Sequence, residues 1–147
     1  MPNETINNAT LLGVDRNDNG VRDDVERWIY ETYEEPVEIG LFIQMGYAYQ
    51  KIIIDPKKAK ETQKYMHDQL SCEFYWTYDA KDANETFQLD GYRDTESEIK
   101  PIQMNTLARH MAYERYNAEF HGTVLDQVPH DKNMCLFDEN GHLKVQP

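Results

Sequence analysis

The apolar residues of this chain recur mostly at helical spacing. Between residues 23 and 33 they fall at i, i+3, i+4 and i+8, which places them on one face of an amphipathic helix. They are Val25, Trp28, Ile29 and Tyr33. The pattern predicts a first helix over this range, and Glu35-Pro36 ends it.

A longer apolar segment runs from Pro36 to Ile54. Pro36 suits the first turn of a helix, because its missing N–H has no partner to lose there, and Asp55-Pro56 ends the pattern. The high apolar content predicts a central, buried helix. Four polar residues interrupt a segment that is barely long enough to cross a bilayer, which argues against a membrane span. They are Glu38, Gln44, Gln50 and Lys51.

Two further helices are predicted. Asp55 can cap one that has the following proline in its first turn and continues toward Trp76. Pro101 would kink or end the turn that contains it, so the fourth helix is expected over about residues 102–125. The spacing of the apolar residues supports both assignments.

The two ends of the chain have less regular patterns. Residues 1–14 are mostly polar and are predicted to form a flexible arm. In the tail, residues 126–147, Asn140-Gly141 between two short apolar runs predicts a small β-hairpin. At 147 residues the chain suits one domain. We therefore expect a single all-α domain, a compact bundle of about four helices with its helical core over 23–125 and a short C-terminal β-hairpin.

The most specific chemical signal is the twelve-residue segment DRNDNGVRDDVE, from Asp15 to Glu26. Calcium is a hard cation that takes roughly six to eight oxygen ligands, and a loop that offers side chains at alternate positions can wrap it. Gly20, in the middle of the segment, permits the sharp turn that such a loop needs. The expected calcium ligands are the side chains of Asp15, Asn17, Asn19, Asp23 and Glu26 and the backbone carbonyl of Val21.

This segment resembles the calcium loop of the EF-hand family, over Asp15–Glu26 and the helix that follows. It departs from the family because no helix is predicted before the loop, and because Arg22 stands where paired EF-hands carry an apolar residue. The sequence also contains no second loop. The segment is more similar to the single DxNxNG loops of bacterial extracytoplasmic proteins. That resemblance implies an ion that braces the domain, and argues against a calmodulin-like switch.

Another interpretation of the same residues needs no ion. Asp23, Asp24 and Glu26 would favour the positive N-terminal end of a helix, and Asp-Asn-Gly would form a solvated turn. If calcium does bind, the asparagines lower the charge of the ligand set. The affinity should then be near the weak, extracellular end of the range.

Charge narrows the range of partners. The chain has 15 basic and 27 acidic residues, a formal net charge of -12. An extended contact with nucleic acid or with an anionic membrane would therefore be repelled. A basic protein partner is favoured, although the same acidity equally serves to keep a soluble protein soluble.

The two cysteines bear on the compartment. Cys72 and Cys135 form no CxxC pair, so neither a zinc knuckle nor a thioredoxin-type site is indicated. A disulfide between them would fit an oxidising compartment, and two buried thiols are the alternative. Residues 1–12 lack the basic start and apolar run of a signal peptide. We expect a periplasmic or secreted protein whose signal peptide is not present in this chain.

A second possible metal site lies on the fourth predicted helix. His110, Glu114, Asn117 and His121 fall at offsets 0, 4, 7 and 11, on a narrow stripe. Two imidazoles and a carboxylate can bind zinc, so a small metal-dependent hydrolase using His110, Glu114 and His121 is the alternative function. A solvated stripe beside an apolar face is common in helices, and we favour this explanation of the four residues. No GxSxG motif or phosphate-binding glycine loop is present.

The sequence therefore predicts a calcium-stabilised, non-enzymatic protein that binds a protein partner. An inhibitor or an immunity factor would fit this description.

Overall fold

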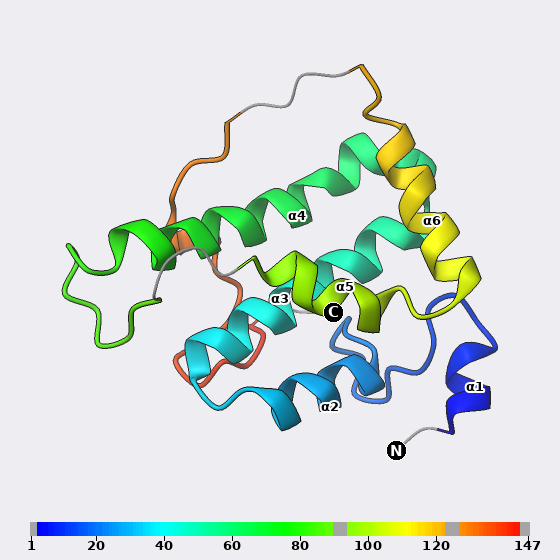
Figure 1. Cartoon of the computed structure of the whole chain (residues 1–147), viewed down its shortest axis with the longest axis horizontal. Coiled ribbons are helices and arrows are strands. Elements are labelled where there is room, and N and C mark those ends of the chain that lie inside the picture. The colour runs from blue at the N-terminus through cyan, green and yellow to red at the C-terminus, as the bar shows by residue number, and fades with distance from the viewer. Residues whose placement is uncertain (1–2, 90–93, 123–126, 145–147) are drawn as a thin grey trace.

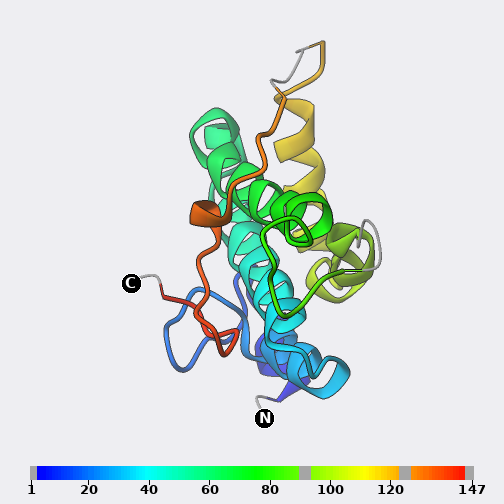
Figure 2. The ribbon, with the colours of Figure 1, turned by 90° about the vertical axis from the view of Figure 1, so that its left-hand side faces the viewer.

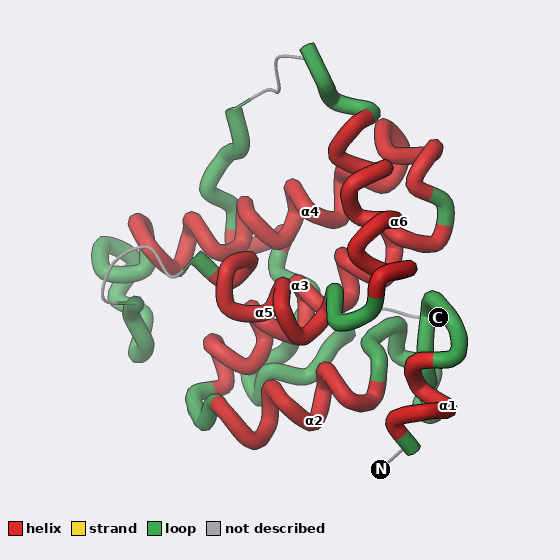
Figure 3. The backbone as a smooth tube through the Cα atoms, turned by 45° about the vertical axis from the view of Figure 1, so that its right-hand side comes forward, coloured by secondary structure: helices red, strands yellow, loops and turns green. Residues whose placement is uncertain are grey.

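The computed structural model describes residues 3–89, 94–122 and 127–144. Within these ranges the chain forms six α-helices and no β-strand, so the all-α prediction is confirmed (Figure 3). The helices are α1 (Glu4–Asn8), α2 (Asp23–Thr32), α3 (Pro36–Ile54), α4 (Ala59–Phe74), α5 (Thr95–Gln103) and α6 (Leu107–Ala118). A 3-10 turn over Pro56–Lys58 leads into α4, a wider π-type turn over Tyr75–Asp79 follows it, and a second 3-10 turn covers Lys132–Met134.

Helix α3 is the centre of the fold, as its apolar pattern predicted. Of its 19 residues, 14 are buried. Helix α4 returns along α3 after the turn at Asp55, and α2 packs against α3 as well (Figure 1). In Figure 2 the C-terminal segment lies on one side of the α3–α4 pair, and α5 and α6 lie on the other. None of the helices in the described ranges combines the length and the apolar character that crossing a membrane requires.

The fourth predicted helix is split in the structure. Pro101 lies inside α5, which continues to Gln103, and α6 begins only at Leu107. The separation has a local cause, since the Thr106 side chain accepts a hydrogen bond from the backbone N–H of Arg109 at 3.2 Å and so caps a new helix. Helix α6 ends at Ala118, earlier than the prediction of 102–125, of which residues 123–125 lie outside the described part.

The predicted C-terminal β-hairpin is wrong for the part of the tail that the structure describes. Phe137 and Leu143 form a single antiparallel bridge, and the turn between them includes Gly141, whose N–H donates to the Asp138 carbonyl at 3.0 Å. Two backbone hydrogen bonds flank the bridge, from the Asp138 N–H to the His142 carbonyl at 2.8 Å and from the Lys144 N–H to the Leu136 carbonyl at 2.7 Å. A further N–H of this pairing is used by α3. The N–H of Leu136 donates to the Gln44 side chain at 2.9 Å.

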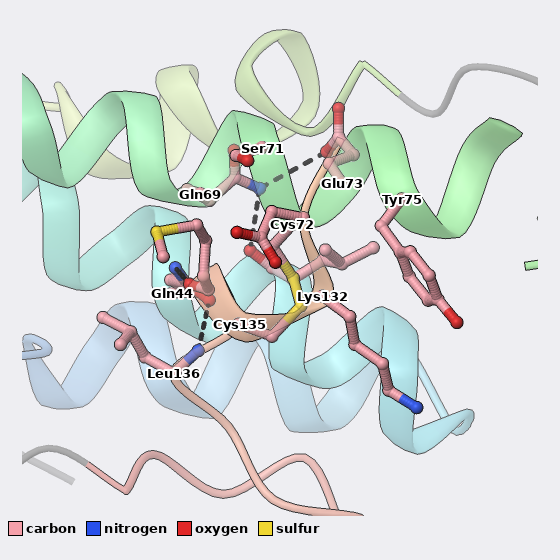
Figure 4. The surroundings of a disulfide bond; sticks show 12 residues. Gln44, Gln69, Ser71, Cys72, Glu73, Tyr75, Lys132, Cys135 and Leu136 are labelled. Carbon is pink, nitrogen blue, oxygen red and sulfur yellow. Dashed lines mark hydrogen bonds between the residues drawn. A yellow bond between two sulfur atoms is a disulfide. The ribbon is translucent and has the colours of Figure 1, made fainter. Parts of the chain in front are cut away.

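A disulfide fastens this C-terminal segment to α4. Cys72 and Cys135 are bonded, with their Cα atoms 4.9 Å apart (Figure 4). Beside the bond, the Gln44 amide also donates to the Met134 carbonyl at 2.9 Å. The predicted disulfide is therefore present, and the alternative of two free thiols does not apply.

The N-terminal residues are attached to the core by Arg109 of α6, whose side chain is fully buried. Its guanidinium donates hydrogen bonds of 2.7–3.2 Å to the backbone carbonyls of Asn7, Thr10 and Leu11. The predicted arm is thus tied to a helix about a hundred residues away. Its own sequence does not show this attachment.

Candidate calcium site

The segment Asp15–Glu26 forms a closed loop that ends in the first turn of α2. The N–H of Asp23 donates to the carbonyl of Val14 at 2.8 Å, which brings the two ends of the loop together. Val21 and Val25 are fully buried, so the loop and the start of α2 are anchored in the core. The preceding helix α1 ends at Asn8, and no helix runs directly into the loop. The sequence predicted no helix in this arm, whereas the structure places the short helix α1 there, separated from the loop by residues 9–14.

Asp15 organises the turn of the loop. Its carboxylate accepts hydrogen bonds from the backbone N–H groups of Asn19 at 3.3 Å and Gly20 at 2.8 Å. Gly20 has a φ of +83°, and a Cβ atom placed there would lie 2.7 Å from the Tyr47 ring of α3. This position therefore requires glycine for two reasons, its left-handed backbone and its close approach to an aromatic ring.

Three of the expected ligands converge on one point. The side-chain amides of Asn17 and Asn19 both donate to the Glu26 carboxylate, the first at 3.4 Å. The Asn19 oxygen accepts the N–H of Val21 at 3.0 Å. The side chains of Asn17, Asn19 and Glu26 line a cavity of about 200 Å³. Tyr30 and residues of α3 and the C-terminal segment complete its wall.

The other two carboxylates take separate positions. Asp23 accepts the backbone N–H of Arg16 at 3.1 Å, so it holds the loop backbone. Asp15 lines a different hollow, beside Lys51 of α3. Across the described ranges, no three His, Cys, Asp or Glu side chains lie close enough together to hold a metal ion. The structure thus gathers Asn17, Asn19 and Glu26, and leaves Asp15 and Asp23 as hydrogen-bond acceptors for the loop.

The loop concentrates negative charge in a partly buried place. Burial raises the pKa of Asp15, and the neighbouring carboxylates of Asp23 and Asp18 raise it further. Burial also raises the pKa of Glu26, with Asp23 and Asp15 adding to the effect. A cation placed among these groups would reduce their mutual repulsion.

The chemistry of this set fits calcium. Carboxylate oxygens, amide oxygens and a backbone carbonyl are the ligands that calcium prefers, whereas zinc would call for histidine or cysteine. Asn17 and Asn19 present nitrogen to Glu26, so their amides must turn before their oxygens can face an ion. Asp15, Asn17, Asn19, Asp23, Glu26 and the Val21 carbonyl remain the residues that would hold it.

The second candidate site is not assembled. His110 Nε2 lies 3.8 Å from Glu114 Oε1, and both side chains are more than half exposed. His121 follows the end of α6, in a turn. The observed pair corresponds to the solvated stripe that was the alternative explanation for these residues.

Arg22 has a structural role in the loop that its sequence pattern did not predict. It departs from the family pattern, yet its side chain is fully buried and forms an ion pair with Asp24 at 2.5 Å. It also donates to the carbonyls of Ile102 and Gln103 at 2.9 Å each. Arg22 therefore fastens the loop to the end of α5. The available signal was an arginine next to two aspartates at a predicted helix start.

Comparisons with known proteins identified no relative of this chain. No family model, no curated protein and no solved structure matches the chain.

Proposed function

We propose that this protein binds calcium through Asp15, Asn17, Asn19, Val21, Asp23 and Glu26, and that the ion fastens the N-terminal segment to the helical core. The observation that carries the proposal is the convergence of Asn17 and Asn19 on the Glu26 carboxylate. Glu26 belongs to α2, whose buried face packs into the core, while Asn17 and Asn19 belong to the loop. An ion shared by these groups would couple the loop to the helix.

The wider role proposed here is that of a calcium-stabilised, non-enzymatic protein of the periplasm or the extracellular space. The Cys72–Cys135 disulfide supports an oxidising compartment, where free calcium is also abundant. The net charge of -12 supports a basic protein partner, as for an inhibitor or an immunity factor. Association with such a partner should weaken as salt is raised, because salt screens the attraction between exposed charges.

Calorimetric titration with calcium chloride tests the site. We expect one calcium ion per chain, and a melting temperature that rises with calcium concentration. At a concentration about one hundred times Kd, the added stability should be about 2.7 kcal/mol. Magnesium should bind more weakly, because it demands a more rigid octahedral ligand set.

Matched variants separate the site from general acidity. Glu26→Gln and Asp15→Asn should each abolish or strongly weaken calcium binding. Glu31→Gln removes the same charge from an exposed position of α2, where Glu31 pairs with Arg27, and it should leave binding unchanged. Calcium binding that is absent up to millimolar concentrations, or that survives Glu26→Gln intact, would contradict the proposal.

A further inference from the structure

A second cavity, of about 270 Å³, lies where α3, α4, α5 and α6 meet. Each of the four helices contributes to its wall. The contributors include Met45 of α3, Gln69 and Glu73 of α4, Glu96 of α5, and Tyr113 and Tyr116 of α6. This volume suits a small organic molecule. It has no residue in common with the candidate calcium loop.

Most of the wall is apolar and aromatic. Met45 and Met66 supply thioether side chains, and Tyr116 and Phe120 supply rings that pack edge to face with centroids 5.2 Å apart. Methionine side chains adapt their shape to a guest, and aromatic ring faces attract cations. The wall therefore favours a ligand with an apolar body.

The wall carries two carboxylates, and His67, which lies 3.1 Å from the Gln63 amide, is its one basic side chain among the described residues. Among the described residues that line the cavity, the carboxylates of Glu73 and Glu96 are present, and no lysine or arginine is. Lys100 lies with its ammonium 4.2 Å from the centre of the Tyr113 ring, but it does not line the cavity. A cationic ligand is selected by this arrangement, and an anionic one is repelled.

Gln69 adds a hydrogen-bond acceptor that no residue of the described ranges uses. Its side chain is fully buried, and its amide nitrogen donates to the Leu41 carbonyl at 3.2 Å and to the Glu73 carboxylate at 3.3 Å (Figure 4). These two bonds fix the orientation of the amide. The oxygen on the other side is left buried without a partner. Such a group costs stability unless a donor reaches it.

A larger cavity elsewhere does not show the same selectivity. It has a volume of about 500 Å³ and lies beside Trp76 and the disulfide. Lys132 and Lys144 line it together with Glu85, Asp138 and Glu139, so it offers charged groups of both signs. In addition, Lys132 is already paired with Glu85 at 2.5 Å.

We propose that the cavity between α3, α4, α5 and α6 binds a small organic ammonium ion, a primary amine attached to an apolar body. An ammonium group carries three donors and no acceptor, which matches the Gln69 oxygen and the carboxylates of Glu73 and Glu96. The apolar body would lie against Met45, Tyr116 and Phe120. This site is independent of calcium, so either proposal can fail without the other.

Three probes with the same phenyl body and different head groups test the charge preference. They are 2-phenylethylamine, which is cationic, 2-phenylethanol, which is neutral, and 3-phenylpropionate, which is anionic. Titrations followed by calorimetry and by amide NMR should show the amine binding at least about tenfold more tightly than the alcohol. The acid should not bind at the same concentrations. The NMR shifts should centre on the Gln69 side-chain amide.

Variants locate the site. Glu96→Gln keeps an acceptor for the Tyr113 hydroxyl, which now donates to Glu96 at 2.7 Å, so the fold should be retained. It should weaken the amine at least about tenfold and leave the alcohol unchanged. Phe120→Ala should weaken both, because it removes part of the apolar wall. Glu114→Gln, the same charge change on an exposed face of α6, should affect neither.

Three results would overturn the proposal. The amine could fail to bind at millimolar concentrations, the three probes could bind equally, or the affinity for the amine could be the same in the wild type and in Glu96→Gln.

Discussion

Arg22 and Arg109 place two like charges close together inside the protein. Both are fully buried, and both donate to the side-chain oxygen of Asn105, at 3.3 Å and 2.6 Å. Burial, and then the neighbouring Arg22, lower the pKa of Arg109 to about 10, while Asp24 opposes the shift. Arg109 therefore remains charged at neutral pH. Several donors of the two guanidiniums are used by backbone carbonyls in loops and at helix ends, which offsets the cost of burying them.

Arg109→Met tests how far the N-terminal segment depends on this residue. Methionine fills a similar length but cannot donate, so the carbonyls of Asn7, Thr10 and Leu11 lose their partner. We expect the free energy of unfolding in urea to fall by about 3 kcal/mol or more. Arg115→Met, an exposed change on the same helix, should stay within about 0.5 kcal/mol of wild type. Equal effects of the two substitutions would show that the buried contacts are unimportant.

Glu73 makes stability depend on pH. It is almost fully buried, and this burial raises its pKa above the ordinary value of 4.5, although hydrogen bonds from Thr95 and Gln69 oppose the rise. The folded state therefore holds the proton more tightly than the unfolded state. The contribution of Glu73 to stability is complete below about pH 4.5, and it is lost as pH rises through the folded pKa.

Glu73→Gln should remove this part of the pH dependence. We expect the free energy of unfolding of the wild type to fall more steeply than that of the variant as pH rises from about 4.5 to neutrality. Chemical unfolding at a series of pH values measures the difference between the two slopes. Parallel curves for wild type and variant would contradict the shift in pKa.

At the scale of elements, polar residues of α3 hold irregular segments in place. Gln44 bonds to the backbone of the C-terminal segment, and Gln50 donates to the Leu12 carbonyl at 3.0 Å. Gln103 of α5 in turn donates to Gln50 at 3.0 Å. Gln44 and Gln50 argued against a membrane span in the sequence. In the structure they attach loops to the central helix.

Gly20→Ala tests the packing of the candidate calcium loop against α3. The left-handed backbone strains alanine, and its Cβ would overlap the Tyr47 ring, so unfolding in the presence of chelator should show a loss of about 2–4 kcal/mol. Gly122→Ala is the matched control. Gly122 has a φ of +74° with nothing within 4 Å of an added Cβ, so only the backbone strain of about 1 kcal/mol applies. Similar losses of unfolding free energy in the two variants would mean that the contact between Gly20 and the Tyr47 ring does not limit the size of the side chain at this position.

At the scale of the whole molecule, the disulfide joins segments 63 residues apart along the chain. It connects α4 to a segment that is also held by Phe137, which is buried in a cluster with Leu41 and Trp76. Hydrogen bonds add to this attachment, such as the one that Ser71 donates to the Pro129 carbonyl at 2.6 Å. By closing a loop of the chain, the disulfide lowers the conformational entropy of the unfolded state more than that of the folded state.

Reduction of the disulfide should lower the free energy of unfolding by roughly 4 kcal/mol on the chain-entropy model. Urea unfolding with and without a reducing agent measures the change. The double variant Cys72→Ser with Cys135→Ser should resemble the reduced protein and should not respond to the reductant. A loss of less than about 1 kcal/mol would indicate that the C-terminal segment is held mainly by its other contacts.

The sequence by itself determined the features that depend on near neighbours. The spacing of apolar residues predicted α2 over 23–33 and α3 over 36–54, and the structure has them at Asp23–Thr32 and Pro36–Ile54. The spacing of oxygen-bearing side chains from Asp15 to Glu26 likewise depends on twelve consecutive residues. Helical periodicity and loop spacing are local properties, which is why a single sequence expresses them.

Only the tertiary structure decided which distant residues meet. It directed Arg109 to the carbonyl of Asn7, brought Gln69 and Glu96 to one cavity, and gave the Leu136 N–H to Gln44 where the sequence predicted a hairpin. Each of these contacts joins residues far apart along the chain. Their pairing is chosen by the packing of whole helices and by the need to satisfy buried polar groups, and no local pattern records either.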